Sequence, residues 1–209
     1  MAKIILDISA NTHKNNWDYL KRMLDELKAV DTGKHSITIK HQLFKEAGQN
    51  IPLDKTIFDL AYVYAEQLGY KTTASVFDKE SLDFLLQFDV PFIKIANNRD
   101  LDYLIGEIPR KIPVYVSYGS PVDKNFISKL NIIPLLCISN YPANIEDYEK
   151  AFTNKLLHKF YGFSDHTVNF DLWNKYQPQI IEMHYGLSDS TGLDAGPFMR
   201  TPAMLAEVL

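Results

Sequence analysis

Residues 160–186, FYGFSDHTVNFDLWNKYQPQIIEMHYG, decide the fold of this chain. The stretch holds two apolar, strand-like runs, Phe160–His166 and Gln179–Gly186, separated by enough residues for one loop and one helix. Each run carries a histidine near its end, His166 and His184. A strand–helix–strand unit of this length predicts two adjacent parallel strands. Both imidazoles are then expected at the carboxyl-terminal edge of the same sheet.

The same alternation of short apolar runs and amphipathic segments extends along the whole chain. Most of the runs are continuously apolar at their centres, as buried parallel strands are. We predict eight strands, over Lys3–Ser9, Ser36–Leu43, Thr72–Phe77, Phe92–Asn97, Pro113–Tyr118, Ile133–Ser139, Phe160–His166 and Gln179–Gly186.

Helix start and stop signals lie between these runs. Asn16 precedes one amphipathic segment, and Gly69 follows another as a helix-ending glycine. Asp78 and Asp123 are placed to cap two further helices, and a last helix is expected to begin near Thr201. The sequence therefore predicts a helix after most of the strands.

Eight strand–helix units favour an α/β fold of the (β/α)8 TIM-barrel type over an open doubly wound sheet, which is the alternative. The 209 residues lie near the lower limit of about 200 for such a barrel, so the loops must be short. We see no linker and treat 1–209 as one domain. The loop Tyr185–Pro202 follows the last strand and is expected to lie over the barrel mouth.

Composition excludes several classes of protein. The net charge is −4 and no cluster of Lys and Arg stands out, which argues against nucleic acid as a partner. The single cysteine, Cys137, cannot form an internal disulfide, in keeping with a reducing compartment. No signal-peptide core and no run of about 20 apolar residues is present, so no membrane partner and a cytoplasmic location are expected.

Polar side chains are expected to gather where the strands end. The set comprises Asp7, Asn11, Lys40, Gln42, Ser75, Asp78, Lys94, Asn97, Arg99, Ser117, Ser139, Tyr141, Ser164, His166, Glu182 and His184. A barrel interior is otherwise apolar, so the strand lysines Lys40 and Lys94 need a counter-charge. Either an acid such as Asp7 or Glu182 pairs with them, or they bind an anion such as phosphate. Several serines at the same edge favour the anion site.

The two histidines predict a second feature of this edge. Two neutral imidazoles, His166 and His184, with acidic residues nearby could hold a divalent metal and leave positions open for a substrate. A Schiff-base aldolase is the weaker alternative, in which Lys94 or Lys40 serves as an amine nucleophile with a depressed pKa. That alternative leaves the two histidines without a role.

The motifs at these positions resemble, in order and spacing, the sialic acid synthase family of N-acetylneuraminate, pseudaminate and legionaminate synthases. The resemblance rests on residues 5–11, 39–45, 75–85, 92–96, 116–120, 139–148, 162–167 and 181–185, most specifically on Ser-Asp-His-Thr (164–167). It implies a (β/α)8 barrel that condenses phosphoenolpyruvate with an N-acyl amino sugar, releases phosphate and forms a nonulosonic acid. Members of the family are dimers, so a homodimer is a further expectation.

The resemblance also implies roles for particular residues. The expected catalytic residues are Asp7, Lys94 and His166. The expected substrate-binding residues are Asn11, Lys40, Gln42, Lys94, Asn97, Ser117, Ser139, Tyr141, Ser164 and Asp194. The expected ligands of a divalent metal, manganese or magnesium, are His166 and His184. In this scheme the lysines and serines bind phosphoenolpyruvate, while Gln42, Tyr141 and Asp194 lie near the sugar.

The chain departs from the family pattern at several of these positions. Asp7 stands where the family has Glu, Asn97 replaces a phosphate-binding Ser, and Arg99 reverses the charge of an acid near the sugar. His13 lies one residue beyond the family's Asn-His position, and the family's C-terminal antifreeze-like domain is not expected in these residues. Arg99 suggests a more anionic acceptor. The departures also support a rival function, a catalytically impaired barrel that serves in binding or assembly.

Overall fold

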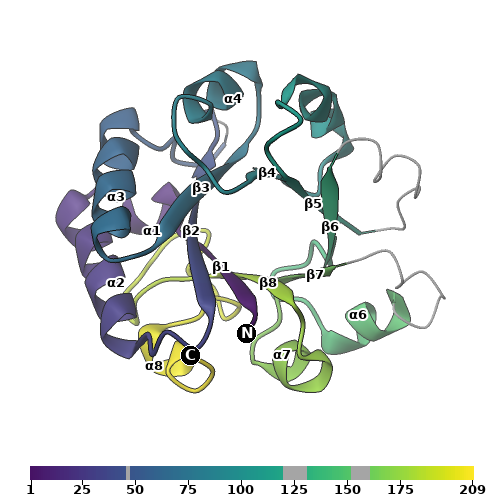
Figure 1. The fold of residues 1–209 in the computed structure, drawn as a ribbon. Helices are drawn as coiled ribbons and strands as arrows, with labels where there is room; N and C mark the ends of the chain where they lie inside the picture. Colours follow the sequence, from purple (N-terminus) through teal and green to yellow (C-terminus); the bar gives the residue numbers. More distant parts are fainter. Residues whose placement is uncertain (46–47, 120–130, 152–160) are drawn as a thin grey trace.

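Eight parallel strands close into a barrel in the order β1 to β8, as predicted (Figure 1). The structure is a computed structural model and describes residues 1–45, 48–119, 131–151 and 161–209. The strands are β1 (Lys3–Asp7), β2 (Ser36–Leu43), β3 (Lys71–Val76), β4 (Ile93–Ile95), β5 (Val114–Tyr118), β6 (Ile132–Cys137), β7 (Gly162–Asp165) and β8 (Ile180–His184).

Helices surround the barrel, as Figure 1 shows in a view along its axis. They are α1 (Ala10–His13), α2 (Trp17–Val30), α3 (Lys55–Gln67), α4 (Lys79–Leu85), the 3-10 helix η1 (Arg99–Glu107), α6 (Ile145–Ala151), α7 (Asp171–Tyr176) and α8 (Pro202–Leu205). Among the described residues, no helix combines the length and the apolar character needed to cross a bilayer.

The local signals in the sequence explain where several helices begin and end. The Asn16 side chain accepts the Tyr19 N–H at the start of α2, and Asp78 forms a capping box with Ser81 at the start of α4. Gly69 follows α3 with a φ of +89°, which glycine adopts at little cost. The predicted caps at Asn16 and Asp78 and the helix-ending Gly69 are therefore confirmed.

The remaining helix signals have different outcomes. Thr201 accepts the Met204 N–H and begins α8, as predicted. The predicted cap Asp123 lies outside the described residues. The chain after β4 forms a 3-10 helix that we did not predict, in which Asn98 accepts the Asp100 N–H.

The register around β1 determines which side chains meet at the mouth. Asp7, at the end of β1, lies opposite Lys40 of β2 on one side and opposite His184 of β8 on the other. In β7 and β8 the register places Ser164 opposite Glu182. Closure of the barrel between β1 and β8 therefore brings Asp7, Lys40 and His184 together at the mouth.

The amino-terminal half of the barrel is apolar. Ile5, Phe92, Tyr115, Leu135 and Ile180 form a buried cluster, and the Phe92 and Tyr115 rings stack with centroids 4.0 Å apart. Such a layer of packed side chains is typical of a TIM barrel and leaves no channel. The charged side chains that line the cavity lie instead toward the carboxyl ends of the strands.

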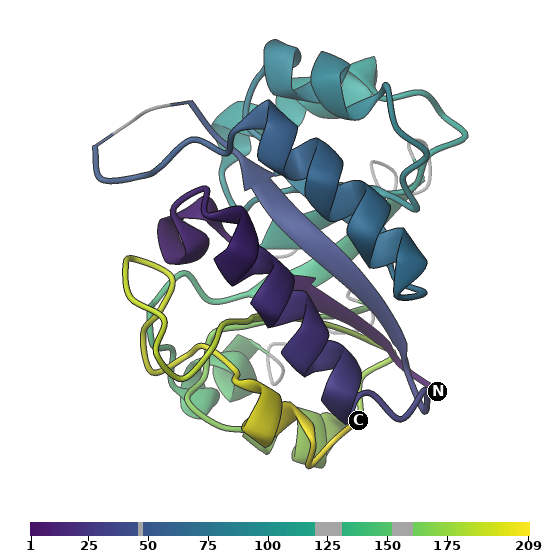
Figure 2. The ribbon, with the colours of Figure 1, turned by 90° about the vertical axis from the view of Figure 1, so that its left-hand side faces the viewer.

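The loop between β8 and α8 folds back beside α1 and α2, as seen in Figure 2. The Tyr19 hydroxyl donates to Asp189 Oδ1 at 2.8 Å, and Lys14 donates to Thr191 Oγ1 at 3.0 Å. Gly192 passes so close to Asn11 that a Cβ would lie 2.1 Å from the Asn11 carbonyl oxygen. The loop is therefore fixed against α1 and α2, where it contributes to the wall of the mouth.

Candidate active site

A cavity of about 180 Å³ lies at the carboxyl ends of the strands. Its lining is Asp7, Lys40, Gln42, Ser75, Phe77, Lys94, Ala96, Asn97, Ser117, Cys137, Ser139, Tyr141, Ser164, His166, Glu182, His184 and Asp194. All the residues assigned above to catalysis, substrate binding or metal binding line this cavity except Asn11. The structure thus brings the predicted set together, while their roles remain predictions.

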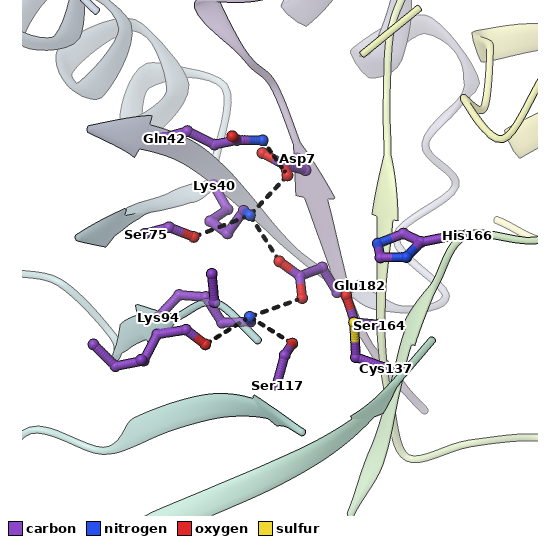
Figure 3. A network of polar contacts seen from close by, with 12 residues as sticks. Asp7, Lys40, Gln42, Ser75, Lys94, Ser117, Cys137, Ser164, His166 and Glu182 are labelled. Carbon is purple, nitrogen blue, oxygen red and sulfur yellow. Dashed lines mark hydrogen bonds and ion pairs between the residues drawn. The ribbon is translucent and has the colours of Figure 1, made fainter. Parts of the chain in front are cut away.

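Two buried lysines share one carboxylate in the cavity floor, as Figure 3 shows. Lys40 Nζ lies 2.7 Å from Glu182 Oε1, 2.8 Å from Asp7 Oδ2 and 3.2 Å from Ser75 Oγ. Lys94 Nζ lies 3.3 Å from Glu182 Oε2 and donates to Ser117 Oγ at 2.7 Å. The pairing with acids, named above as the alternative to anion binding, is therefore present. An anion would have to exchange with the Glu182 carboxylate.

Glu182 is ionised in this arrangement. Burial raises its pKa, but the Coulombic effects of Lys40 and Lys94 outweigh burial and hold the pKa well below its usual value. Burial also lowers the pKa of Lys40, yet Asp7 and Glu182 outweigh it and raise that pKa overall. At Lys94 burial is larger than the opposing effect of Glu182, and the pKa is lowered. Glu182 thus supports the charge on Lys40 more strongly than the charge on Lys94.

Asp7 can exchange a proton near neutral pH. Burial raises its pKa to about 6, against the opposing effect of Lys40 and with the help of the negative charges of Glu182 and Asp194. Gln42 Nε2 donates to Asp7 Oδ2 at 2.7 Å, while Asp7 Oδ1 has no hydrogen-bond partner among the described residues. A carboxyl group with these properties suits general acid–base chemistry.

The two histidine rings face each other across the other side of the cavity, with centroids 5.4 Å apart. His166 Nδ1 donates to the Ile138 carbonyl at 2.8 Å, which leaves Nε2 as the nitrogen with the free lone pair. His184 Nδ1 lies 3.6 Å from Asp194 Oδ1 and 3.8 Å from Asp7 Oδ2, without a hydrogen-bond partner in the described residues. Burial lowers the pKa of each imidazole to about 4. Both rings are therefore neutral at pH 7.

These features fit a divalent metal held by two imidazoles. Neutral imidazole is the form that ligates metals, and His166 has its tautomer set by a backbone carbonyl, as metal ligands commonly do. Within the described part of the chain, no group of three or more His, Cys, Asp or Glu side chains is placed to hold a metal. The remaining coordination positions would have to come from water or a substrate.

Tyr141 forms the outer wall beside the histidines. Its ring centroid lies 4.2 Å from that of His166 and 5.2 Å from that of Phe198, and 52% of the residue is exposed. The Phe198 ring lies 5.0 Å from the His184 ring. Tyr141 thus lines the cavity beside the histidines, and the buried Phe198 ring packs behind it against His184.

Asn97 joins three strand ends at the opposite wall. Its Nδ2 donates to Ser139 Oγ at 2.8 Å, and its Oδ1 accepts the Gly119 N–H at 3.1 Å. An asparagine here therefore occupies two groups, a backbone N–H and a serine hydroxyl, that could otherwise bind an anion.

Two sequence interpretations need correction. Arg99 does not line the cavity: its guanidinium pairs with Asp102 at 3.1 Å, donates to the Ser117 carbonyl at 2.7 Å and lies 3.8 Å from the Tyr118 ring centroid. The start of η1 turns the side chain outward, so the argument for an anionic acceptor is wrong. Asn11 lies behind the wall, where its Nδ2 donates to Asp194 Oδ2 at 2.9 Å.

Two lining residues make contacts that the sequence analysis did not predict. Glu182 was expected at the strand ends as a possible partner of one lysine, and in the structure it bridges both lysines. Cys137 is buried and also lines the cavity beside Ser139, with 3.9 Å between Sγ and Oγ. The one available signal was strand periodicity, since Cys137 and Glu182 stand two residues from Ser139 and His184 on their strands.

Solved structures with similar folds include a sialic acid synthetase. A sialic acid synthetase from Leptospira borgpetersenii, in complex with citrate, superposes with a TM-score of 0.77 over 98% of this chain and 80% of its own, at 23% identity. A putative spore coat polysaccharide biosynthesis protein E from Chromobacterium violaceum gives a TM-score of 0.79 at 17% identity, over 99% of this chain and 72% of its own. These likenesses show the barrel fold.

Curated relatives are similar in sequence as well. An N,N'-diacetyllegionaminic acid synthase from Legionella pneumophila is 29% identical over 60% of this chain and 41% of its own length. A pseudaminic acid synthase from Helicobacter pylori is 26% identical over 72% of this chain and 48% of its own. The chain thus spans less than half the length of either relative. The model of the NeuB family matches residues 24–195, most of the chain, and the chain therefore belongs to the NeuB family.

Proposed function

We propose that this barrel condenses phosphoenolpyruvate with the open-chain aldehyde of an N-acyl amino sugar to give a nonulosonic acid and inorganic phosphate. The observation that supports it most directly is one cavity lined by two buried lysines, four serines and two neutral histidines. Relatives named as legionaminic and pseudaminic acid synthases support the same reaction class.

The lysine side of the cavity is suited to phosphoenolpyruvate. Lys40 and Lys94 supply two ammonium groups, and Ser75 and Ser117 already hydrogen-bond to them and could turn toward an anion. Binding would exchange the Glu182 carboxylate for the phosphate or carboxylate of the substrate. The lysines then stabilise the negative charge of the leaving phosphate.

The acceptor would bind between Asp7, Asp194 and the two histidines. The enol carbon forms a bond to the aldehyde carbon, the aldehyde oxygen gains a proton, water adds to the carbon that carried phosphate, and phosphate leaves. Asp7, with its pKa near 6, is placed to move protons in these steps. A manganese or magnesium ion held by His166 and His184 would supply Lewis acidity for the aldehyde.

The experiment is release of phosphate from phosphoenolpyruvate in the presence of Mn²⁺ and a panel of N-acyl hexosamines. We expect release only with an accepted sugar, and a loss of at least 100-fold in Lys94→Ala and His184→Ala. Lys71→Ala is the matched control, because this β3 lysine is exposed and pairs with Glu66 away from the cavity. No release with any sugar from a protein that still binds phosphoenolpyruvate would contradict the proposal.

The second candidate is a barrel that binds phosphoenolpyruvate or a metal without catalysis. Two observations favour it. Asp7 is one methylene shorter than the family's Glu, and Asn97 hydrogen-bonds to the Gly119 N–H and to the Ser139 hydroxyl, which are then not available to an anion. A shift of about 1 Å in a catalytic group can reduce the rate about a hundredfold. If Asp7→Glu restores phosphate release to an inactive wild type, this candidate is the correct one.

A further inference from the structure

Arg200 is a fully buried cation at the end of the loop between β8 and α8. Its guanidinium donates to Asp165 Oδ2 at 3.2 Å, and neither side chain is exposed to solvent. We call these two residues the clasp. No role was assigned to either of them above, and neither lines the cavity.

The clasp holds the turn that carries His166. Arg200 donates to the backbone carbonyls of Thr167 at 2.8 Å and Asn169 at 2.6 Å. Asp165 Oδ1 accepts the Thr167 N–H at 2.8 Å and the Thr167 hydroxyl at 2.7 Å. The residues before and after His166 are thus each fixed by the clasp.

The same arginine is joined to the strand that carries His184. The Arg200 N–H donates to the His184 carbonyl at 2.7 Å, and the Arg200 carbonyl accepts the Gly186 N–H at 3.0 Å. The guanidinium also donates to the Phe198 carbonyl at 2.8 Å, and the Phe198 ring packs 5.0 Å from His184. The Arg200 side chain and backbone therefore connect the strand ends that carry His166 and His184, and they also contact Phe198.

A purely structural clasp would not require buried charges. Replacing a buried ion pair with apolar side chains often leaves stability unchanged or higher, so such a pair is weak evidence of a stabilising role. The loop is also attached elsewhere, because Arg22 of α2 pairs with Asp189 at the surface. What the clasp adds is a set of directional hydrogen bonds that link the backbone around His166 with the backbone of His184.

We propose that Asp165 and Arg200 are positioning residues that set the separation and orientation of the His166 and His184 rings, and through them the affinity of the pair for a divalent cation. The affinity part rests on the proposed function. The ring geometry does not, since it belongs to the metal-free protein.

The test compares Arg200→Lys and Asp165→Asn with the wild type and with Arg22→Lys, which alters the exposed attachment of the same loop. Mn²⁺ affinity is measured by electron paramagnetic resonance, thermal melting monitors the fold, and imidazole ¹⁵N–¹H spectra report the two rings without metal. Outer-shell partners of metal ligands typically contribute about 10–100-fold in affinity. We expect a loss of this size in both clasp variants, with displaced His166 and His184 resonances, and no change in Arg22→Lys.

The outcomes separate the clasp from the proposed function. If the clasp variants fold and keep both the wild-type Mn²⁺ affinity and the wild-type imidazole resonances, the clasp proposal is overturned. If the wild type itself binds no Mn²⁺, the metal centre of the proposed function fails, and the metal-free spectra still decide whether the clasp positions the rings. Should Arg200→Lys not fold, Asp165→Asn decides, because it keeps the guanidinium and its three carbonyl partners.

Discussion

The lysine side of the cavity and its histidine side differ in how their polar groups are paired. On the lysine side, Lys40 and Lys94 each contact Glu182 and a serine, so the charges are balanced within the protein. On the histidine side, the His184 Nδ1 atom has no hydrogen-bond partner in the described residues and faces two carboxylates at 3.6 and 3.8 Å. One side must exchange a partner to bind a ligand, whereas the other has a position available.

This difference implies that an anion on the lysine side and a cation on the histidine side would bind at different energetic cost. An anion on the lysine side competes with the ionised Glu182, so its net affinity is lower than two buried lysines alone would give. A cation on the histidine side meets neutral imidazoles, and Asp7 and Asp194 lie close enough to attract it. We therefore expect metal binding to be the less demanding of the two events.

The largest expected effect comes from removing the shared carboxylate. Glu182→Gln leaves two buried ammonium groups with less compensation, and breaking a buried pair costs about 3–5 kcal/mol. Glu66→Gln is the matched control, since its pair with Lys71 is more than half exposed and contributes about 0–1 kcal/mol. Urea denaturation measures both. If the free energy of unfolding falls by the same small amount in Glu182→Gln and in Glu66→Gln, Glu182 does not balance the charges of the two buried lysines.

A smaller effect on stability but a clear effect on binding is expected on the histidine side. His184→Gln keeps a polar side chain of similar size and removes one of the two imidazoles proposed to hold the metal. We expect Mn²⁺ affinity to fall about 100-fold, equal to ~2.7 kcal/mol, measured by calorimetry. Stability without metal should change by less than in Glu182→Gln. Unchanged Mn²⁺ affinity would place the metal elsewhere.

Acid should change the contributions of His184 and Asp7 to stability in opposite directions. The folded-state pKa of His184 is about 4, below the ordinary value of 6.5, so the unfolded chain binds the proton more tightly and stability is lost as pH falls from 6.5 toward 4. Asp7 has a folded pKa of about 6, above 3.8, so its contribution grows as pH falls through this range.

Two substitutions separate these contributions. Between pH 7 and pH 5, His184→Gln should lose about 1–2 kcal/mol less stability than the wild type, and Asp7→Asn about 1 kcal/mol more. Urea denaturation at the two pH values measures both differences. If both variants follow the wild-type pH dependence, neither group titrates as its burial indicates.

The smallest expected effect concerns Asn97. Asn97→Ser frees the Gly119 N–H and shortens the side chain that contacts Ser139, so more donors can face an anion on the lysine side. We expect the affinity for inorganic phosphate to rise a few-fold, with stability changed by less than about 1 kcal/mol. Weaker phosphate binding would mean that the Asn97 amide itself is the better donor.

The barrel could be predicted because local signals agree with the global fold. The eight apolar runs and the caps at Asn16, Asp78 and Thr201 are all read from neighbouring residues in the sequence. The positions of polar residues at strand ends follow from the same periodicity, which explains why Lys40 and His184 were placed correctly at the cavity.

The features that escaped prediction depend on contacts between distant residues. Arg99 points outward because η1 begins there, and the preceding strand gives no signal for that turn. Arg200 reaches Asp165 only because the loop after β8 folds back across the end of β7. The double pairing of Glu182 requires the register of β2 and β4 relative to β8, which follows from closure of the barrel.

The most direct test of the account is anomalous X-ray diffraction from crystals containing Mn²⁺ and phosphoenolpyruvate. We predict a manganese peak between His166 Nε2 and the His184 ring, and the anionic groups of phosphoenolpyruvate on Lys40 and Lys94 in place of the Glu182 carboxylate. A cavity without manganese at saturating concentration, with Glu182 still paired to both lysines, would contradict it.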